Sequence, residues 1–154
     1  MNKAGPTRED ALRAIDALSR LSGAFQKRRQ ALAASVGLSE GQWELLEEVS
    51  TEHFMPSMFA RSRSSSAAAV SKILRQLKEK GLVTAAHGSA DGRCRDYELT
   101  VAGRKILGSL RAGREAAIGA IWNDLERDEV LGFADFGAVL ASRLEDYGDE
   151  EQEV

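Results

Sequence analysis

Residues 64–103 read SSSAAAVSKILRQLKEKGLVTAAHGSADGRCRDYELTVAG, and they contain the clearest structural pattern in the chain. In its first part the apolar residues recur three or four positions apart: Val70, Ile73, Leu74 and Leu77. That spacing predicts an amphipathic helix, and Gly81 supplies a stop signal at its end. Two short extended segments follow at residues 82–86 and 95–99, separated by a polar turn at residues 88–92. The change of period predicts a β-hairpin directly behind the helix.

The segment before this helix predicts a second, shorter helix. Pro56 fits the first turn of a helix, because the missing N–H of proline costs nothing there. Residues 61–66, RSRSSS, then form a polar break that is rich in N-cap residues. Two short helices separated by a tight polar turn are a helix-turn-helix pattern. With the hairpin behind it, the pattern predicts a winged helix.

Longer helices flank this winged unit. Thr7 with Asp10, and Ser39 with Gln42, have the spacing of capping boxes, and Thr100 can cap a further helix. We expect a mainly α fold with a small β-hairpin wing, in one domain of residues 1–154. The winged helix-turn-helix unit occupies about residues 39–100, and residues 148–154 form an acidic tail. One domain of this size does not need the long apolar helices at about residues 7–36 and 101–147 outside its winged unit. We therefore expect them to be dimerisation helices. In a symmetric DNA-binding dimer they would set the second helices of the two helix-turn-helix units, the recognition helices, about 34 Å apart.

Charge and composition bound the function. At 154 residues and 16.7 kDa the chain suits one domain with its own core. No stretch resembles a secretory signal, and the single cysteine cannot form an internal disulfide, so we expect a cytoplasmic protein. No apolar run approaches the roughly 18 residues of a membrane span, so we expect no contact with membranes. The net charge is −3, but six of the 24 acids lie in the last ten residues, which leaves 18 acids against 21 bases in residues 1–144, a net +3. Residues 61–95 carry eight bases and two acids, so a surface that meets a polyanion is expected there.

Two motifs resemble the MarR family of winged-helix transcription regulators. DGR at residues 91–93, followed after five residues by LTVAG at 99–103, is similar to the wing signature of that family. It follows LKEKGLV at residues 77–83, which is similar to the end of the family's recognition helix and the start of its wing. The resemblance implies a homodimer that binds a pseudo-palindromic operator in double-stranded DNA. It further implies a repressor that a small phenolic or aromatic effector releases.

The candidate DNA-binding residues lie on the second helix of the pattern and on the wing. Opposite the apolar face of that helix we expect these side chains to face solvent: Ser66, Ser71, Lys72, Arg75 and Gln76. The longer ones can donate hydrogen bonds to base edges, although the same pattern suits a merely solvated helix face. By the family pattern, Arg93 enters the minor groove and Asp91 holds it in place, with an ordinary hairpin salt bridge as the alternative. Arg63 and Arg95 are weaker candidates for phosphate contacts.

The resemblance also implies a ligand crevice between the dimerisation helices and the winged unit. His53, Trp43 and Arg20 are candidates for it, although each alone suits an ordinary core or surface position. Cys94 stands between two arginines that favour its thiolate, so a redox-sensing regulator is an alternative function. A cysteine without a resolving partner is, however, more often unreactive.

The remaining functional classes find little support. His53, His87 and Cys94 are too few for a metal site, and we expect neither a metal nor another cofactor. No nucleophile–base pair, catalytic carboxylate motif or phosphate-binding glycine loop is present, so we expect no enzyme and no catalytic residues. The alanines at residues 67–69 and the negative net charge leave a protein–protein interaction module as a further alternative.

Overall fold

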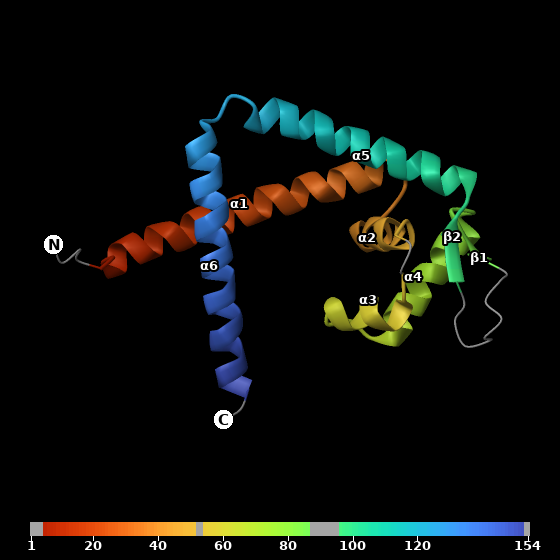
Figure 1. Ribbon diagram of the computed structural model, residues 1–154, viewed down its shortest axis with the longest axis horizontal. Coiled ribbons are helices and arrows are strands. Elements are labelled where there is room, and N and C mark those ends of the chain that lie inside the picture. Colours follow the sequence, from red (N-terminus) through yellow and green to blue (C-terminus); the bar gives the residue numbers. More distant parts are fainter. Residues whose placement is uncertain (1–4, 52–53, 87–95, 153–154) are drawn as a thin grey trace. The chain divides into compact units, whose positions relative to one another are not determined.

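The computed structural model describes residues 5–51, 54–86 and 96–152 (Figure 1). The chain divides into two compact units, Met1–Gly113 and Arg114–Val154. The described residues form these elements: α1 (Arg8–Ser35), α2 (Glu40–Val49), α3 (Pro56–Ser62), α4 (Ala67–Glu79), β1 (Val83–Ala86), β2 (Asp96–Leu99), α5 (Val101–Trp122) and α6 (Arg127–Gln152). The mainly α fold with a β-hairpin is therefore confirmed.

Both predicted capping boxes are present. The Thr7 hydroxyl accepts a hydrogen bond from the Asp10 N–H, and the Asp10 carboxylate accepts from the Thr7 N–H, so two donors at the start of α1 are satisfied. The hydrogen bonds from Thr7, first from its side chain, hold the pKa of Asp10 below its ordinary value. Ser39 and Gln42 make the same exchange at the start of α2.

The hairpin is shorter than predicted because its first residue belongs to the helix end. Gly81 has a φ of 70°, and the N–H of Leu82 donates to the carbonyl of Leu77 at 2.9 Å, which closes the end of α4. β1 therefore begins at Val83, where it pairs with Leu99 of β2 in an antiparallel register. The turn predicted at residues 88–92 lies outside the described residues.

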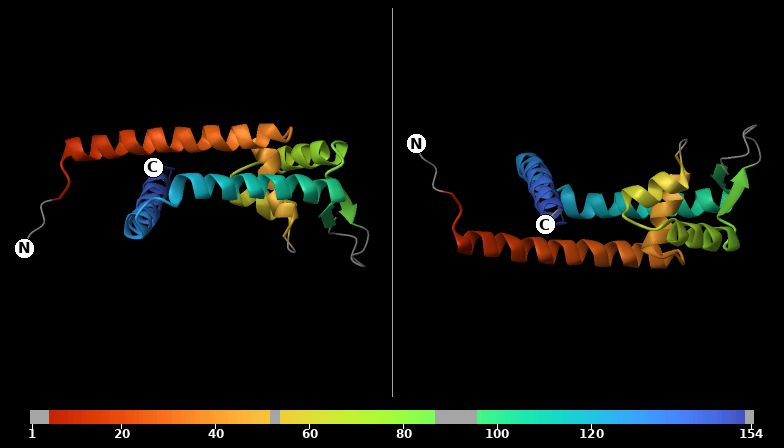
Figure 2. Two further views of the ribbon diagram at one scale, coloured as in Figure 1. Left: turned by 90° about the horizontal axis from the view of Figure 1, so that it is seen from above. Right: turned by 90° about the horizontal axis from the view of Figure 1, so that it is seen from below.

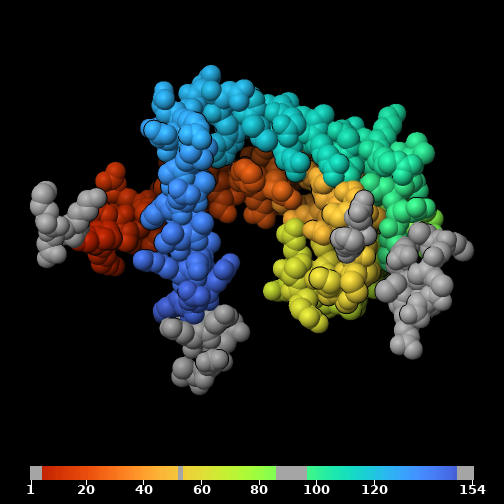
Figure 3. All heavy atoms as spheres, viewed as in Figure 1, coloured from red at the N-terminus to blue at the C-terminus, as the bar shows by residue number. Residues whose placement is uncertain are grey.

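The core of the first unit lies among α2, α4 and the start of α5. The largest fully buried side chains are Leu45, Leu46, Val70, Leu77 and Leu110. Figure 3 shows α2 and α3, orange to yellow, as one continuous body with the start of α5, in green. In Figure 2 the end of α1 runs beside α5, and a Cβ built on Gly113 would lie 2.6 Å from Leu32 Cδ1. The winged unit is thus fixed to a long helix on either side of it in the sequence.

The second unit, taken by itself, has no buried side chain among its described residues. Its helix α6 extends to Gln152, well into the segment expected as an acidic tail, since Glu and Gln are good helix formers. Within the part of the chain that the structure describes, none of the helices combines the length and the apolar character needed to cross a membrane.

Candidate nucleic-acid interface

Helix α4 presents a polar face to solvent, as expected for a recognition helix. The Ser66 hydroxyl caps its start by accepting from the Ala69 N–H at 3.1 Å. Val70, Leu74 and Leu77 are buried on the inner side. The following predicted DNA-binding residues are exposed: Ser66, Ser71, Lys72 and Arg75. The helix therefore offers cationic and hydroxyl donors on its outer side.

Gln76 does not face solvent as expected; it is half-buried and bound to α2. The backbone N–H of Ser39 is a donor only, and it fixes the oxygen of the Gln42 amide as its acceptor at 3.1 Å. Gln42 Nε2 must then be the donor toward Gln76, and it lies 3.0 Å from Gln76 Oε1. The oxygen of Gln76 is thus engaged within the protein, and base contact by Gln76 stays a prediction.

We expect the hydrogen bond between Gln42 and Gln76 to contribute measurably to the free energy of unfolding of the first unit. Gln42→Met keeps the side-chain volume but removes both the cap on Ser39 and the bond to Gln76, so we expect a loss of about 1–2 kcal/mol. Gln76→Met removes only the second bond and should cost about half of that. Urea unfolding of both variants measures the difference. Equal stability of Gln42→Met and wild type would contradict this account.

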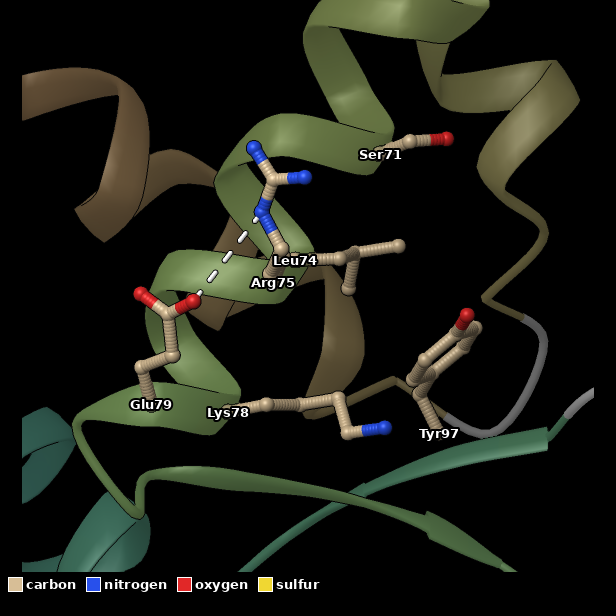
Figure 4. A pocket seen from close by; sticks show the side chains of 6 residues that line it. All are labelled: Ser71, Leu74, Arg75, Lys78, Glu79 and Tyr97. Carbon is tan, nitrogen blue, oxygen red and sulfur yellow. Dashed lines mark ion pairs between the residues drawn. The ribbon is translucent and has the colours of Figure 1, made fainter.

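An open groove of about 470 Å³ lies between α4 and β2 (Figure 4). We call it the α4–β2 groove, and it is lined by Ser71, Leu74, Arg75, Lys78, Glu79 and Tyr97. Sequence reasoning did not single out Lys78, Glu79 or Tyr97. The spacing of Lys78, three residues after Arg75 and seven after Ser71, is a helical-face signal that could have found it. Tyr97 comes from the strand, and no local pattern connects it with the helix.

Arg63 lies just before the turn between α3 and α4 and has partners within the chain. Its guanidinium Nη1 is 3.5 Å from Glu44 Oε1, and its guanidinium carbon is 5.8 Å from the Phe59 ring centroid. The next residue, Ser64, has a φ of 48°, so the chain turns sharply there. The role of Arg63 as a phosphate contact stays a prediction, and a phosphate would have to compete with Glu44.

Acidic side chains of α2 tie the helix-turn-helix to the long helices of the same unit. Arg29 of α1 lies 2.6 Å from Glu40, and it also lies 3.4 Å from Glu44. Arg111 of α5 donates to Glu47 at 2.8 Å, and this hydrogen bond raises the pKa of Arg111. The orientation of α2, and of α4 packed against it, therefore depends on both α1 and α5.

The structure describes two of the three predicted ligand-binding residues, Trp43 and Arg20. Trp43 is buried, and the guanidinium carbon of Arg29 lies 4.8 Å from its ring centroid. Arg20 is exposed and lies nine residues before Arg29 on α1, about 14 Å along the helix axis. His53 lies outside the described residues. The shared ligand role of Trp43, Arg20 and His53 stays a prediction.

The wing candidates also lie outside the described residues: Asp91, Arg93, Cys94, Arg95 and His87. Their assignments rest on the sequence alone. Across residues 5–51, 54–86 and 96–152, no group of three His, Cys, Asp or Glu side chains is placed to hold a metal ion.

Comparison with known proteins gives the class of this fold. No family model and no curated protein matches the chain. Among solved structures, a MarR family transcription regulator has a TM-score of 0.81 at 20% identity and covers 92% of this chain and 95% of its own. Streptococcus pneumoniae FabT in complex with DNA has a TM-score of 0.76 at 18% identity, over 90% of this chain and 99% of its own. Staphylococcus aureus MarR in complex with salicylate and kanamycin has a TM-score of 0.75 at 14% identity, over 90% of this chain and 95% of its own.

The fold is therefore a winged helix-turn-helix. More particularly, it is the fold of the solved MarR structures, one of which is described as a MarR family transcription regulator. The resemblance seen in residues 77–103 is confirmed at the level of the fold.

Proposed function

We propose that this chain is a homodimeric transcription regulator that binds an approximately palindromic site in double-stranded DNA. The observation that carries the proposal is the outer face of α4, where Ser71, Lys72 and Arg75 stand exposed above a buried apolar side. The solved structure of FabT, which shares this fold, is a complex with DNA.

In the proposed complex α4 enters the major groove. Lys72 and Arg75 supply charged donors that suit the acceptor atoms of guanine, while the small side chains at residues 67–69 allow close approach to the bases. Ser66 stands at the helix N-terminus, where a phosphate is favoured. From the sequence, Arg93 is assigned to the minor groove with Asp91 as its support, and Arg95 is assigned to a phosphate.

The dimer proposal rests on apolar side chains left exposed on the long helices. On α6 one stripe repeats every three or four residues and is exposed or half-buried: Phe133, Phe136, Leu140, Leu144 and Tyr147. On α1 a second set is exposed: Leu12, Ile15, Leu18, Leu21 and Phe25. Patches of this extent mark interaction sites. A second copy of the chain is the proposed partner, because a two-fold dimer matches a palindromic site.

We further propose that a small molecule regulates DNA binding. Salicylate, a phenolic acid, is bound to the Staphylococcus aureus protein that shares this fold. A ligand that binds more tightly to a dimer with the wrong spacing of recognition helices would release the operator without covalent chemistry. Through the pairs of Arg29 and Arg111 with α2, movement of α1 or α5 would reach α4. We therefore propose a repressor that an aromatic ligand releases.

The test of DNA binding is fluorescence anisotropy with duplex DNA from upstream of the chain's own gene, in the presence of competitor DNA. Each of Lys72→Ala and Arg75→Ala should raise the Kd about 5-fold to 100-fold, because a charged contact to a base is lost. Lys27→Ala, which removes an exposed lysine of α1, is the matched control and should leave the Kd unchanged. Weak binding that is equal on every duplex and unaffected by the α4 variants would contradict the proposal. It would direct attention to the alternative of a protein partner.

A further inference from the structure

We propose that the α4–β2 groove holds the sugar-phosphate backbone of DNA, with Lys78 and Tyr97 as the backbone contacts and Glu79 as a residue that limits affinity. The inference rests on the proposed function, since it assigns a further part of the same DNA complex. Lys78, Glu79 and Tyr97 are not among the individual DNA-binding residues predicted from the sequence.

The groove lies where a strand of bound DNA would pass. With α4 in the major groove and the hairpin at the adjacent minor groove, one sugar-phosphate strand separates the two and must pass between helix and hairpin. The α4–β2 groove lies between the helix and strand β2 of that hairpin, and it is open to solvent (Figure 4).

Hydrogen-bond donors surround the groove. Lys78 is exposed, and its side chain extends across the groove toward Tyr97 in Figure 4. The hydroxyls of Ser71 and Tyr97 add neutral donors, while buried Leu74 forms the apolar part of the lining. Hydroxyl and ammonium donors around an open groove suit phosphate oxygens, which accept hydrogen bonds only.

Tyr97 is held in place by packing. Its half-buried ring meets Phe54 edge-on, with the ring centroids 6.2 Å apart and an interplanar angle of 73°. Among the described residues no hydrogen bond occupies the Tyr97 hydroxyl. A ring fixed in this way presents its hydroxyl to a phosphate with little loss of side-chain freedom on binding.

Glu79 is the one carboxylate among the groove-lining residues, and it opposes the approach of a phosphate. Glu79 Oε1 lies 4.0 Å from Arg75 Nε, and both side chains are about 70% exposed, so this ion pair is weak. Because this pair leaves the charge of Glu79 largely uncompensated, that charge would repel a phosphate in the groove. Glu79 therefore lowers affinity for every DNA sequence alike.

Anisotropy titrations at several salt concentrations test the assignment, with an operator duplex and an unrelated duplex in parallel. Lys78→Ala should weaken binding to both duplexes by the same factor, about threefold to tenfold, and should reduce the slope of log K against log salt by about 0.9. Glu79→Gln should strengthen binding to both by about twofold to fivefold. Tyr97→Phe keeps the ring and should weaken binding to both duplexes by about twofold to fivefold. It should leave the slope of log K against log salt unchanged, because no charge is removed.

The outcomes separate this inference from the proposed function. Lys27→Ala is the charge control, and thermal unfolding confirms that each variant is folded. If wild type binds its operator specifically but Lys78→Ala and Glu79→Gln leave the Kd and the slope unchanged, the groove assignment is overturned and the proposed function stands. A loss on the operator alone for Lys78→Ala would show base reading and also overturn it. Failure of wild type to bind any duplex at low salt would instead remove the proposed function.

Discussion

Gly103→Ala is expected to destabilise the first unit by about 3 kcal/mol or more, enough to unfold a marginal domain. A Cβ at this position would lie 2.1 Å from the carbonyl oxygen of Leu82 and 3.1 Å from its carbonyl carbon. The neighbour is backbone, so it cannot turn away as a side chain would. The same oxygen accepts the N–H of Thr100 at 3.0 Å, which fixes it further. Close approach of α5 to the end of α4 therefore requires glycine at residue 103.

Gly108→Ala in the same helix is the matched control. A Cβ built on Gly108 has no heavy atom of the described residues within 4 Å, outside the local backbone of its own helix. Alanine should therefore stabilise α5 by about 0.5–1 kcal/mol, because it restricts the unfolded chain more than glycine does. Urea and thermal unfolding of both variants measure the contrast. The account of this contact is wrong if the two variants have the same stability.

Phe136→Asp is expected to convert the proposed dimer to a monomer. The side chain of Phe136 is 61% exposed in the single chain, and it belongs to the apolar stripe of α6 (the α6 stripe: Phe133, Phe136, Leu140, Leu144 and Tyr147). Burying an unpaired carboxylate against the stripe of a second copy would cost several kcal/mol. Because two linked half-sites bind far more tightly than one, DNA affinity should fall about 100-fold with the dimer.

The control for Phe136→Asp is Ser142→Asp, which adds the same charge on α6 away from the α6 stripe. Sedimentation equilibrium of wild type and both variants gives the oligomeric state directly. We expect a dimer for wild type and Ser142→Asp and a monomer for Phe136→Asp. A monomeric wild type, or a dimer that survives Phe136→Asp, would show that the α6 stripe has another role.

Local signals explain why much of the fold could be predicted from the sequence. The boxes at Thr7 and Ser39 and the inner face of α4 depend on residues at most a few positions apart, so a linear pattern contains them. The predicted strand begins one residue too early, at Leu82, because Leu82 completes the cap of α4. The extent of α6 was missed because acidic residues suit a solvated end and a helix equally well.

Long-range contacts explain what the sequence did not show about the interface. Gln76 shares the helical face pattern of solvent-exposed residues, but its partner Gln42 is 34 residues away. Arg63 is exposed, as a candidate phosphate contact should be, but folding also places Glu44 beside it. Tyr97 joins Lys78 only because β2 returns alongside α4. Such pairs arise from packing between elements, and no spacing within one element encodes them.

Bound sites can be selected from a random duplex library and sequenced, which shows whether the protein recognises a palindromic site. One homodimer should bind two half-sites through its two α4 helices. We therefore expect an enriched inverted repeat whose half-sites lie about 10 base pairs apart, centre to centre. A pool without any enriched motif, or with one unrepeated half-site, would contradict it.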